Sequence, residues 1–343
     1  MPRFFHLGAV ASAKLSMASR TAGDADWDPL SLPSPAEAVG CATISLRTLF
    51  TSTSASGAAS THNHAMKKSL NSLLATWQIR GAAGRRSVSL ATFDAGAKPF
   101  SSGNKETDRL AVEQLAGRID ELQDMMFAVK RHKLLVVLQG LDGSGKDGTV
   151  RGVFARTSPL GVRTAGWRAP SEEERAHDFL WRIHARVPQA GEIMVFNRSH
   201  YEDVLVPRVT GTLDAAAARQ RYAHINDFER MLSETGTVIL KFMLHISKDE
   251  QRERLQARID DPTKQWKINL DDLEVRKQWK QYQQAYAALL AATSTAWAPW
   301  TIVPANSKTH RNLMIATVVV DKLESLRSRY PDPDPRLASI QVE

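Results

Sequence analysis

The strongest chemical signal in the chain is a glycine-rich segment with one lysine, LQGLDGSGKDG at residues 138–148. Gly140, Gly145 and Lys146 fit the spacing G-x-x-x-x-G-K of a phosphate-binding P-loop. The glycines of such a loop let backbone N–H groups turn toward an anion, and the lysine reaches the outer phosphates. The alternative is a solvated turn of glycine and aspartate. An apolar run before the segment and a helix-compatible run after it favour the P-loop.

Two acids distinguish this P-loop from the usual pattern. The residue after the lysine is normally Ser or Thr, but here it is Asp147, and Asp142 lies inside the loop. A carboxylate repels phosphate unless a cation lies between them. We therefore interpret Asp142 as a ligand of a hard cation such as Mg²⁺, with Asp147 as a second candidate.

A second polar segment, FNRSHYEDVLVPRV at residues 196–209, begins where another apolar run ends. P-loop kinases usually have a second acidic metal ligand at this strand end, whereas this chain has Asn197, a neutral oxygen ligand. Arg198, Glu202, Asp203 and Arg208 follow. Acids suit Mg²⁺ or the attacking group, and arginines suit phosphate. The alternative is an ordinary helix start whose acids complement the helix dipole.

A third segment, from about residue 251 to 280, is rich in cations. Arg254 and Arg258 are four residues apart and should project from one helix face, and Lys264 and Lys267 follow the predicted helix end. Such a run is similar to the lid of a nucleoside phosphate kinase, which brings cations onto the transferring phosphoryl group and excludes water. The alternative is a solvated, charged helix face.

These segments require a scaffold of alternating strands and helices. Short apolar runs predict strands at 134–138, 162–166, 192–197, 237–247 and 301–303. Helical periodicity and capping signatures predict helices at 105–129, 171–187, 215–234, 248–259, 271–292 and 308–329. The alternation predicts an α/β fold with a parallel sheet covered on both faces. Ligands bind at the carboxyl ends of such strands, so the turns after Phe196 and Ser247 should lie beside the P-loop.

The N-terminal part of the chain has a different composition. Residues 1–65 are rich in Ala, Ser, Thr and Gly, so we expect a disordered extension, or a start codon assigned too far upstream of Met66. A faint transit-peptide character is the alternative. Residues 66–103 are expected to form an arm over the main body. In the helix that follows, an apolar stripe should pack into the core: Leu115, Ile119, Leu122 and Met126.

The bulk composition narrows the class of partner. The chain has 343 residues, a net charge of +8 and a pI of about 9.6. This balance favours an acidic partner: nucleic acid, an anionic membrane surface or a polyanionic small substrate. The single cysteine, Cys41, excludes an internal disulfide framework and a cysteine-based zinc site, and fits a reducing compartment. The sequence has no run of 18 or more apolar residues, so we expect no membrane span.

Taken together, the segments resemble polyphosphate kinase family 2. The resemblance is carried by LQGLDGSGKDGT (138–149), EEERAHDFLWR (172–182), FNRSHYEDVL (196–205), YAHINDFERML (222–232), the run from 240 to 267, and WAPWTIVPANSKTHRN (297–312). It spans residues 66–331, which we expect to form one domain followed by a tail at 332–343. The form FNRSHYED is most similar to the branch that phosphorylates both nucleoside mono- and diphosphates.

The resemblance implies a P-loop kinase αβα sandwich with a helical lid, and Mg²⁺-dependent, reversible transfer of a terminal phosphoryl group from inorganic polyphosphate to a nucleotide. The implied catalytic residues are Asp142, Lys146, Arg198, Glu202 and Asp203. The implied metal ligands are Asp142, Asn197 and Asp203. The implied phosphate and polyphosphate contacts are Gly140, Gly143, Ser144, Gly145, Lys146, Asp147, Gly148, Arg198, Arg208, Arg254, Arg258, Lys264 and Lys267. It also implies a cytoplasmic homo-oligomer without nucleic-acid or membrane partners.

Two departures and two rival functions accompany this resemblance. The usual Phe-Lys-Ala-Pro of the family is Trp-Arg-Ala-Pro at 167–170, and Arg differs from Lys in geometry, so that segment is left out of the catalytic set. The first rival is an ATP-dependent nucleotide kinase of the same fold, which would place Ser or Thr where Asp147 stands. The second is a non-catalytic polyanion-binding protein. Loss of turnover in EDTA would separate a catalyst from such a binder.

Overall fold

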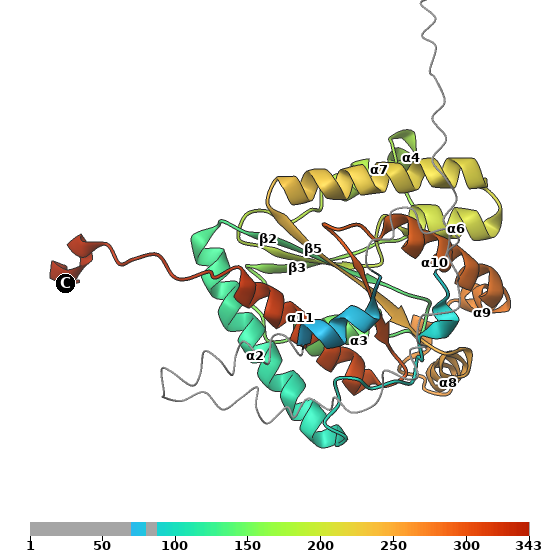
Figure 1. The fold of residues 1–343 in the computed structure, drawn as a ribbon, viewed down its shortest axis with the longest axis horizontal. Coiled ribbons are helices and arrows are strands. Elements are labelled where there is room, and N and C mark those ends of the chain that lie inside the picture. The colour runs from blue at the N-terminus through green and yellow to red at the C-terminus, as the bar shows by residue number, and fades with distance from the viewer. Residues whose placement is uncertain (1–69, 80–87, 343) are drawn as a thin grey trace, which may run out of the picture. The chain divides into compact units, whose positions relative to one another are not determined.

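The computed structural model describes residues 70–79 and 88–342. The expectations for residues 1–65, including Cys41, lie outside these residues. In the described part, a six-stranded sheet has the order β1-β6-β5-β2-β4-β3 (Figure 1). The strands are β1 (Gln78–Ile79), β2 (Lys133–Gln139), β3 (Val162–Gly166), β4 (Ile193–Asn197), β5 (Thr237–His245) and β6 (Trp300–Pro304).

The sheet is parallel except at one edge. Strands β2 to β6 pair in parallel, as predicted, whereas β1 pairs antiparallel with β6 and was not predicted as a strand. The residues of β1 belong to the segment expected to form an arm, and residues 70–77 before them are helical. The arm thus adds a short strand to the sheet. The predicted parallel sheet therefore has one additional, antiparallel strand at this edge.

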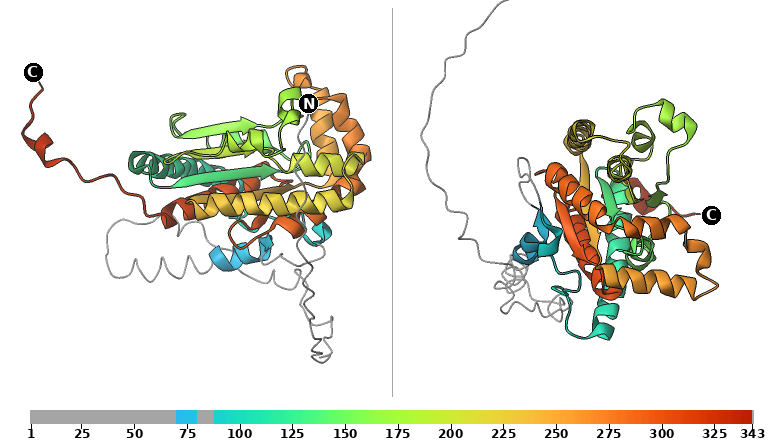
Figure 2. Two further views of the ribbon diagram at one scale, coloured as in Figure 1. Left: turned by 90° about the horizontal axis from the view of Figure 1, so that it is seen from above. Right: turned by 90° about the vertical axis from the view of Figure 1, so that its right-hand side faces the viewer.

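Helices cover both faces of the sheet, as Figure 2 shows. Alternating residues of β2 divide between two cores: Leu134 and Val136 belong to one, and Leu135 and Val137 to the other. The first core includes side chains of α2 (Lys105–Val129), α3 (Lys146–Val153) and α11 (Lys308–Ser325). The second includes α6 (Glu202–Thr210), α7 (Ala215–Glu234) and α10 (Trp279–Thr293). This confirms the predicted αβα sandwich.

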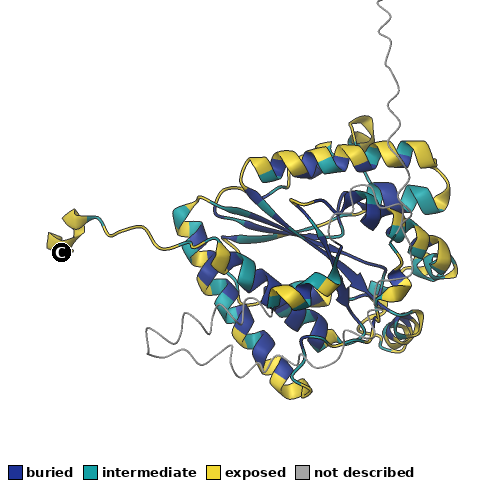
Figure 3. Cartoon of the chain, in the orientation of Figure 1, coloured by how far each residue is buried: buried dark blue, intermediate teal, exposed yellow. Residues whose placement is uncertain are grey.

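The long helix α2 occupies the predicted residues, and its apolar stripe is buried as expected. Leu115, Ile119, Leu122 and Met126 are at most 6% exposed. The side chain of Asn104 caps the first turn by accepting hydrogen bonds from two backbone N–H groups. Figure 3 shows the resulting pattern, in which β2, β4, β5 and β6 are largely buried and the outer faces of the helices are exposed.

Two predicted helices are interrupted. The segment 171–187 forms α4 (Glu172–Ala176), with the expected capping box of Ser171 and Glu174, and then α5 (Trp181–His184). Asp178 causes the break, because its carboxylate accepts from Leu180 N and its carbonyl from Trp181 N. The segment 271–292 likewise divides at Gln278 into α9 (Leu270–Lys277) and α10. Helix α8 (Lys248–Ile259) precedes α9 at the position predicted for the lid.

Candidate active site

The P-loop joins β2 to α3 through turns that glycine adopts easily. Gly140 and Gly145 have φ angles of +152° and +101°, a region in which residues with a Cβ are strained. A Cβ at Gly145 would lie 1.9 Å from Nη1 of Arg311, and a Cβ at Gly140 would lie 2.8 Å from the Leu244 carbonyl oxygen. The loop is therefore packed closely against both β5 and α11.

Lys146 lies inside this loop. Its Nζ donates hydrogen bonds to the carbonyl oxygens of Gly140 at 2.6 Å and Leu141 at 3.3 Å. The same Nζ lies 3.7 Å from Oδ1 of Asp142. Burial lowers the pKa of Lys146, and the neighbouring Asp142 opposes this shift. The ammonium group is thus held beside the carboxylate of the loop.

Asp142 is the negative centre of a group of cations. Its Oδ1 accepts a hydrogen bond from Nη2 of Arg198. Burial alone would raise the pKa of Asp142, but the charges of Lys146, Arg198 and Arg258 leave this pKa below its ordinary value. Asp142 is therefore ionised at neutral pH. A carboxylate in this state is a suitable ligand for a hard cation.

Arg198 connects the second segment to the P-loop. Its backbone N–H donates to the carbonyl of Leu138 at 3.0 Å, and its Nη1 lies 3.5 Å from Oε2 of Glu202. Its φ of +67° is left-handed, which is uncommon for a residue other than glycine. Glu202 in turn accepts a hydrogen bond from Gln139 at the end of β2. Burial raises the pKa of Glu202, and Arg198 opposes that shift.

The carboxyl ends of β2 and β4 thus bring together most of the predicted site. Asn197 joins this group because its Nδ2 donates to Oδ1 of Asp147 at 2.7 Å. The turn after Ser247 also lies beside the loop, as expected, since Nε2 of Gln251 donates to the Asp142 carbonyl at 2.8 Å. Gln251 accepts from Arg276 of α9 at 3.0 Å. The Gln251 side chain therefore connects α9 to the P-loop.

Asp203 and Arg208 are not part of this group. Both carboxylate oxygens of Asp203 accept from Nη2 of Arg182 at 2.9 Å, and no hydrogen bond or ion pair in the described part of the chain joins Asp203 to the P-loop. Nη1 of Arg208 donates to the carbonyl of Leu213 at 2.7 Å, beyond the end of α6. We therefore remove Asp203 from the metal ligands and Arg208 from the phosphate contacts. Asp203 pairs with Arg182, and Arg208 stabilises the turn after α6.

Arg254 also has a different role from the one expected. Its five N–H groups donate to Glu250 and to four backbone carbonyls, those of Gly143, Ser144, Ala305 and Asn306, at 2.7 to 3.2 Å. A guanidinium has five donors, so none remains for polyphosphate. Arg254 is 8% exposed and braces the P-loop against the turn after β6. We therefore remove it from the polyphosphate path.

The other predicted lid cations remain accessible. Arg258 lies one helical turn after Arg254, and its charge lowers the pKa of Asp142, after the larger effects of Lys146 and Arg198. Nζ of Lys264 pairs with Asp261 at 2.5 Å on the surface, and Lys267 lies over the ring of Trp266. Surface pairs of this kind are weak and can be exchanged for a phosphate partner.

Sequence reasoning assigned no role to Arg311, which lies at the P-loop, or to Arg182, which lies outside it. Arg311, in the first turn of α11, is buried against the P-loop, and its Nη1 donates to the Ser144 carbonyl at 3.3 Å. Burial, together with Arg254, lowers its pKa to about 9, so it remains charged at neutral pH. Arg182 joins α5 to Asp203. The rule that ligands lie after strand ends would have identified Arg311, which follows β6, whereas nothing local identifies Arg182.

The residues present fit a magnesium ion that is shared with a substrate. Within the described ranges, no group of three or more His, Cys, Asp or Glu side chains is arranged to hold a metal. Mg²⁺ is commonly bound by one or two carboxylates, with waters and substrate phosphates completing its shell. Asp142 meets that requirement. The buried hydroxyls of Ser144 and Thr149 have no hydrogen-bond partner in the described structure, which also suits a polar ligand at the loop.

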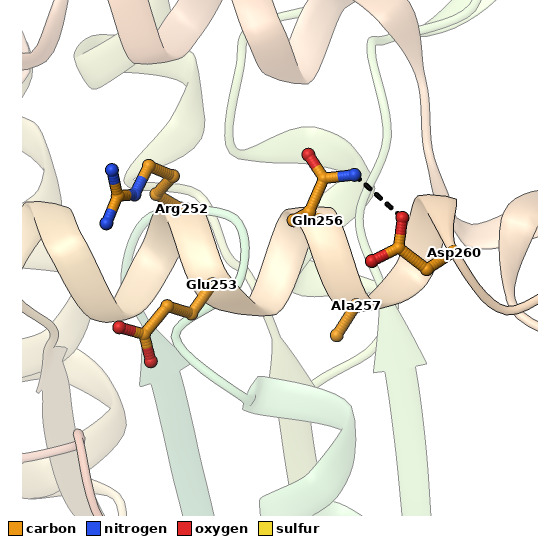
Figure 4. Close-up of a pocket in the computed structure, with 5 residues that line it drawn as sticks. All are labelled: Arg252, Glu253, Gln256, Ala257 and Asp260. Carbon is orange, nitrogen blue, oxygen red and sulfur yellow. Dashed lines mark hydrogen bonds between the residues drawn. The ribbon is translucent and has the colours of Figure 1, made fainter.

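A separate hollow lies on the outer side of α8, as Figure 4 shows. It has a volume of about 480 Å³ and is lined by Arg252, Glu253, Gln256, Ala257 and Asp260. These residues occupy the helix face opposite Arg254 and Arg258, as 3.6 residues per turn requires. The hollow is therefore not part of the P-loop group. None of the described helices is long and apolar enough to cross a membrane.

Comparison with known proteins now identifies the family. The model of the family Polyphosphate kinase 2 (PPK2) matches residues 102–331. The chain belongs to the polyphosphate kinase 2 family. It is 48% identical over 254 residues to the AMP/ADP-polyphosphate phosphotransferase of Meiothermus ruber, which covers 74% of this chain and 95% of the relative. It is 38% identical over 272 residues to the ADP-polyphosphate phosphotransferase of Rhodopseudomonas palustris. That match covers 76% of this chain and 93% of the relative.

A solved structure of the family has the same fold. The crystal structure of polyphosphate kinase 2 from Arthrobacter aurescens TC1 matches with a TM-score of 0.71 and 42% identity, covering 76% of this chain and 96% of that one. The predicted P-loop kinase fold is therefore confirmed for this polyphosphate kinase 2. The P-loop, Arg198 and Glu202 lie at the strand ends where this fold binds its ligands.

Proposed function

We propose that this polyphosphate kinase 2 transfers the terminal phosphoryl group of inorganic polyphosphate to AMP and ADP, reversibly and with Mg²⁺. The observation that carries the proposal is that Lys146 and Arg198 both pair with Oδ1 of the ionised Asp142 in a P-loop. Relatives named for polyphosphate-dependent phosphorylation of AMP and ADP support the same substrates. The positive net charge of the chain suits a polyanionic donor.

The chain's own residues would position and neutralise the reacting phosphates. The transition state of phosphoryl transfer is loose, with charge spread over three oxygens, so cations placed in advance supply much of the catalysis. Lys146 and Arg198 have this role, and backbone N–H groups of residues 143–148 hold the donor or acceptor phosphates. Bound Mg²⁺ would neutralise phosphate charge. Asp142 would hold it, and the amide oxygen of Asn197 is a second candidate ligand.

Glu202 is assigned to orienting Arg198 rather than to proton transfer. The attacking group is a phosphate oxygen of AMP or ADP, which is already ionised at neutral pH, so no general base is required. Oε2 of Glu202 lies 3.5 Å from Arg198, and Gln139 donates to Oε1. These contacts fix the guanidinium between Glu202 and Asp142.

The polyphosphate path would run along the lid. Its cations would be Arg258, Lys264 and Lys267. Arg254 is excluded because all five of its donors are used within the protein. Arg254 holds α8 against the P-loop, and the charge of Arg258 already acts on Asp142. Movement of the segment after α8, which carries Lys264 and Lys267, would bring these cations to the phosphates and exclude water. Self-association, a cytoplasmic location and the lack of nucleic-acid and membrane partners remain predictions.

The deciding experiment measures ATP formed from AMP and from ADP by the purified chain, with Mg²⁺ and long-chain polyphosphate and without added ATP. ATP from both acceptors is the expected result. ATP from ADP alone would restrict the function to nucleoside diphosphates. Phosphorylation that requires added ATP would indicate an ordinary nucleotide kinase, and binding of polyphosphate that persists in EDTA without turnover would indicate a polyanion binder.

A further inference from the structure

A buried ion pair lies in the core, apart from the residues proposed to contact the phosphates. Lys241 of β5 and Glu229 of α7 are both 0% exposed at their side chains, and Nζ of Lys241 lies 2.6 Å from Oε2 of Glu229. Burial lowers the pKa of Lys241. Burial alone would raise the pKa of Glu229, but Lys241 and His200 together leave that pKa below its ordinary value. The 2.6 Å contact makes them an ion pair in the core, where replacing such a pair by apolar residues is often neutral or stabilising.

The pair lies at the centre of a network in which Lys241 uses all three of its hydrogens. Nζ of Lys241 also donates to the Tyr201 hydroxyl at 2.8 Å and to the Thr293 carbonyl at 2.7 Å, which occupies its three hydrogens. The Tyr201 hydroxyl donates to Oε1 of Glu229 at 2.7 Å. The ring of Trp300 lies 5.1 Å from the ammonium nitrogen. A satisfied network in a dry core holds its members rigidly.

Tyr201 connects this network to the site. It immediately precedes α6, whose first residue is Glu202, and it follows Arg198 by three residues. His200, also buried, lies with its Nε2 3.4 Å from Oε1 of Glu229. The network therefore holds two consecutive residues between the two site residues, from the side of the segment that faces the core.

The other side of the segment is tied to the end of β2. The Ser199 hydroxyl donates to Oε1 of Gln139 at 3.2 Å and accepts from Tyr201 N at 3.2 Å. Between these ties, Arg198 has its left-handed φ of +67°. Strained backbone of this kind persists only where the surroundings determine it from several directions. The core network holds segment 198–202 from one side, and Gln139 holds it from the other.

We propose that Lys241, Glu229 and Tyr201 form a positioning network that keeps Arg198 and Glu202 in the geometry required for phosphoryl transfer. None of the three contacts substrate; they act through the strained segment 198–202. The proposal rests on the proposed function, in which Arg198 stabilises the transferring phosphoryl group. Loss of the network would lower turnover while the P-loop, which binds the ground state, stays intact.

The test compares two variants that preserve packing. Tyr201→Phe removes one hydroxyl and leaves the ion pair, and the double variant Glu229→Leu with Lys241→Met removes both charges without leaving either unpaired. We expect kcat for ATP formation from ADP to fall on the order of 10- to 100-fold, because small displacements of reacting groups cost that much. KM for ADP should change by less than about twofold, since ground-state binding is unaffected.

Thr317→Val is the matched control. Thr317 of α11 is also buried, and its hydroxyl donates to the Leu313 carbonyl at 2.8 Å, remote from the network. This variant should keep wild-type kcat even if its Tm falls. Wild-type kcat in both folded network variants would overturn the proposal, as would a loss of kcat that disappears at an assay temperature well below the Tm of each variant.

Amide hydrogen exchange provides a readout that does not depend on turnover. In Tyr201→Phe, exchange should accelerate on the order of tenfold at residues 198–202 and stay unchanged in α11, because only the tether is lost. Unchanged exchange at 198–202 would contradict the network. If the unaltered chain formed no ATP from AMP or ADP, the proposed function would fail, and the exchange measurement would still decide whether the network holds the segment.

Discussion

At the scale of single residues, Asp142 is the acid whose removal should be most damaging. Its carboxylate accepts from Arg198, lies 3.7 Å from Lys146 and is our candidate Mg²⁺ ligand. We expect Asp142→Asn to lower kcat by 10² to 10⁵, roughly the range for lost charge-stabilising groups. The fold should persist, because asparagine has nearly the same volume. ATP formation from ADP and a thermal unfolding curve check both parts.

The matched control for this prediction is Asp147→Asn. Asp147 is exposed, and its one side-chain hydrogen bond in the described structure is accepted from Asn197. We expect a fall of less than about tenfold, as is usual for a partly solvated contact. Equal losses in the two variants would mean that Asp147, rather than Asp142 alone, serves the metal.

The two arginines of α8 should separate stability from polyphosphate binding. Arg254→Gln breaks hydrogen bonds to four carbonyls around the P-loop and should lower the free energy of unfolding by about 2 to 4 kcal/mol. Arg258→Gln removes a charge that faces Asp142 without hydrogen bonds in the described structure. It should leave stability within about 0.5 kcal/mol and raise KM for polyphosphate. Urea unfolding and kinetics with varied polyphosphate distinguish them.

At the scale of elements, the arm before α2 should make stability depend on pH through His310. Nε2 of His310 in α11 accepts from Phe100 N at 3.2 Å, and burial lowers the pKa of His310 to about 4 from 6.5. A histidine that must stay neutral binds fewer protons in the folded state. Stability is therefore complete above pH 6.5 and is lost as pH falls toward 4, by on the order of 3 kcal/mol.

His310→Gln tests that dependence. The glutamine oxygen can accept the same hydrogen bond but does not titrate in this range. We expect the unfolding free energy of the variant to fall less than that of the wild type between pH 7 and pH 4.5, as measured by urea unfolding at both values. Parallel pH profiles for the two proteins would show that His310 is not the responsible group.

The elements also show what local pattern can and cannot predict. Helix α2 was predicted at its observed residues because its apolar stripe is a local pattern. The helix predicted at 171–187 failed because the Asp178 side chain offers the backbone a competing turn. The spacing of Arg254 and Arg258 gave the helix face correctly, but it could not tell that the carbonyls after β6 would saturate Arg254, since those residues lie about fifty positions away.

The same distinction holds for the site. Asp142, Lys146 and Arg198 were predicted together because strand ends of a parallel sheet meet at one edge. Asp203 was grouped with them by proximity in sequence, but α6 turns its carboxylate toward Arg182. The pairing of Lys241 with Glu229 had no sequence signal, because one lies in a strand and the other in a helix.

At the scale of the whole molecule, the positive charge should make the affinity for polyphosphate depend on the length of the donor. The chain has a net charge of +8, and the accessible lid cations Arg258, Lys264 and Lys267 extend beyond the P-loop. Salt screens exposed charges, with a Debye length of about 10 Å at 0.1 M and 3 Å at 1 M. A long polyphosphate chain contacts many such charges at once, whereas tripolyphosphate reaches few beyond the loop.

We therefore expect KM for long-chain polyphosphate to rise on the order of tenfold between 0.05 and 0.5 M NaCl, because its exposed contacts are screened. KM for tripolyphosphate should rise by only about two- to threefold over the same range, since the contacts inside the loop are buried. Initial rates of ATP formation from ADP, with Mg²⁺ held in excess over phosphate, measure both. Equal salt dependence for the two donors would mean that binding ends at the P-loop and that the lid cations serve another purpose.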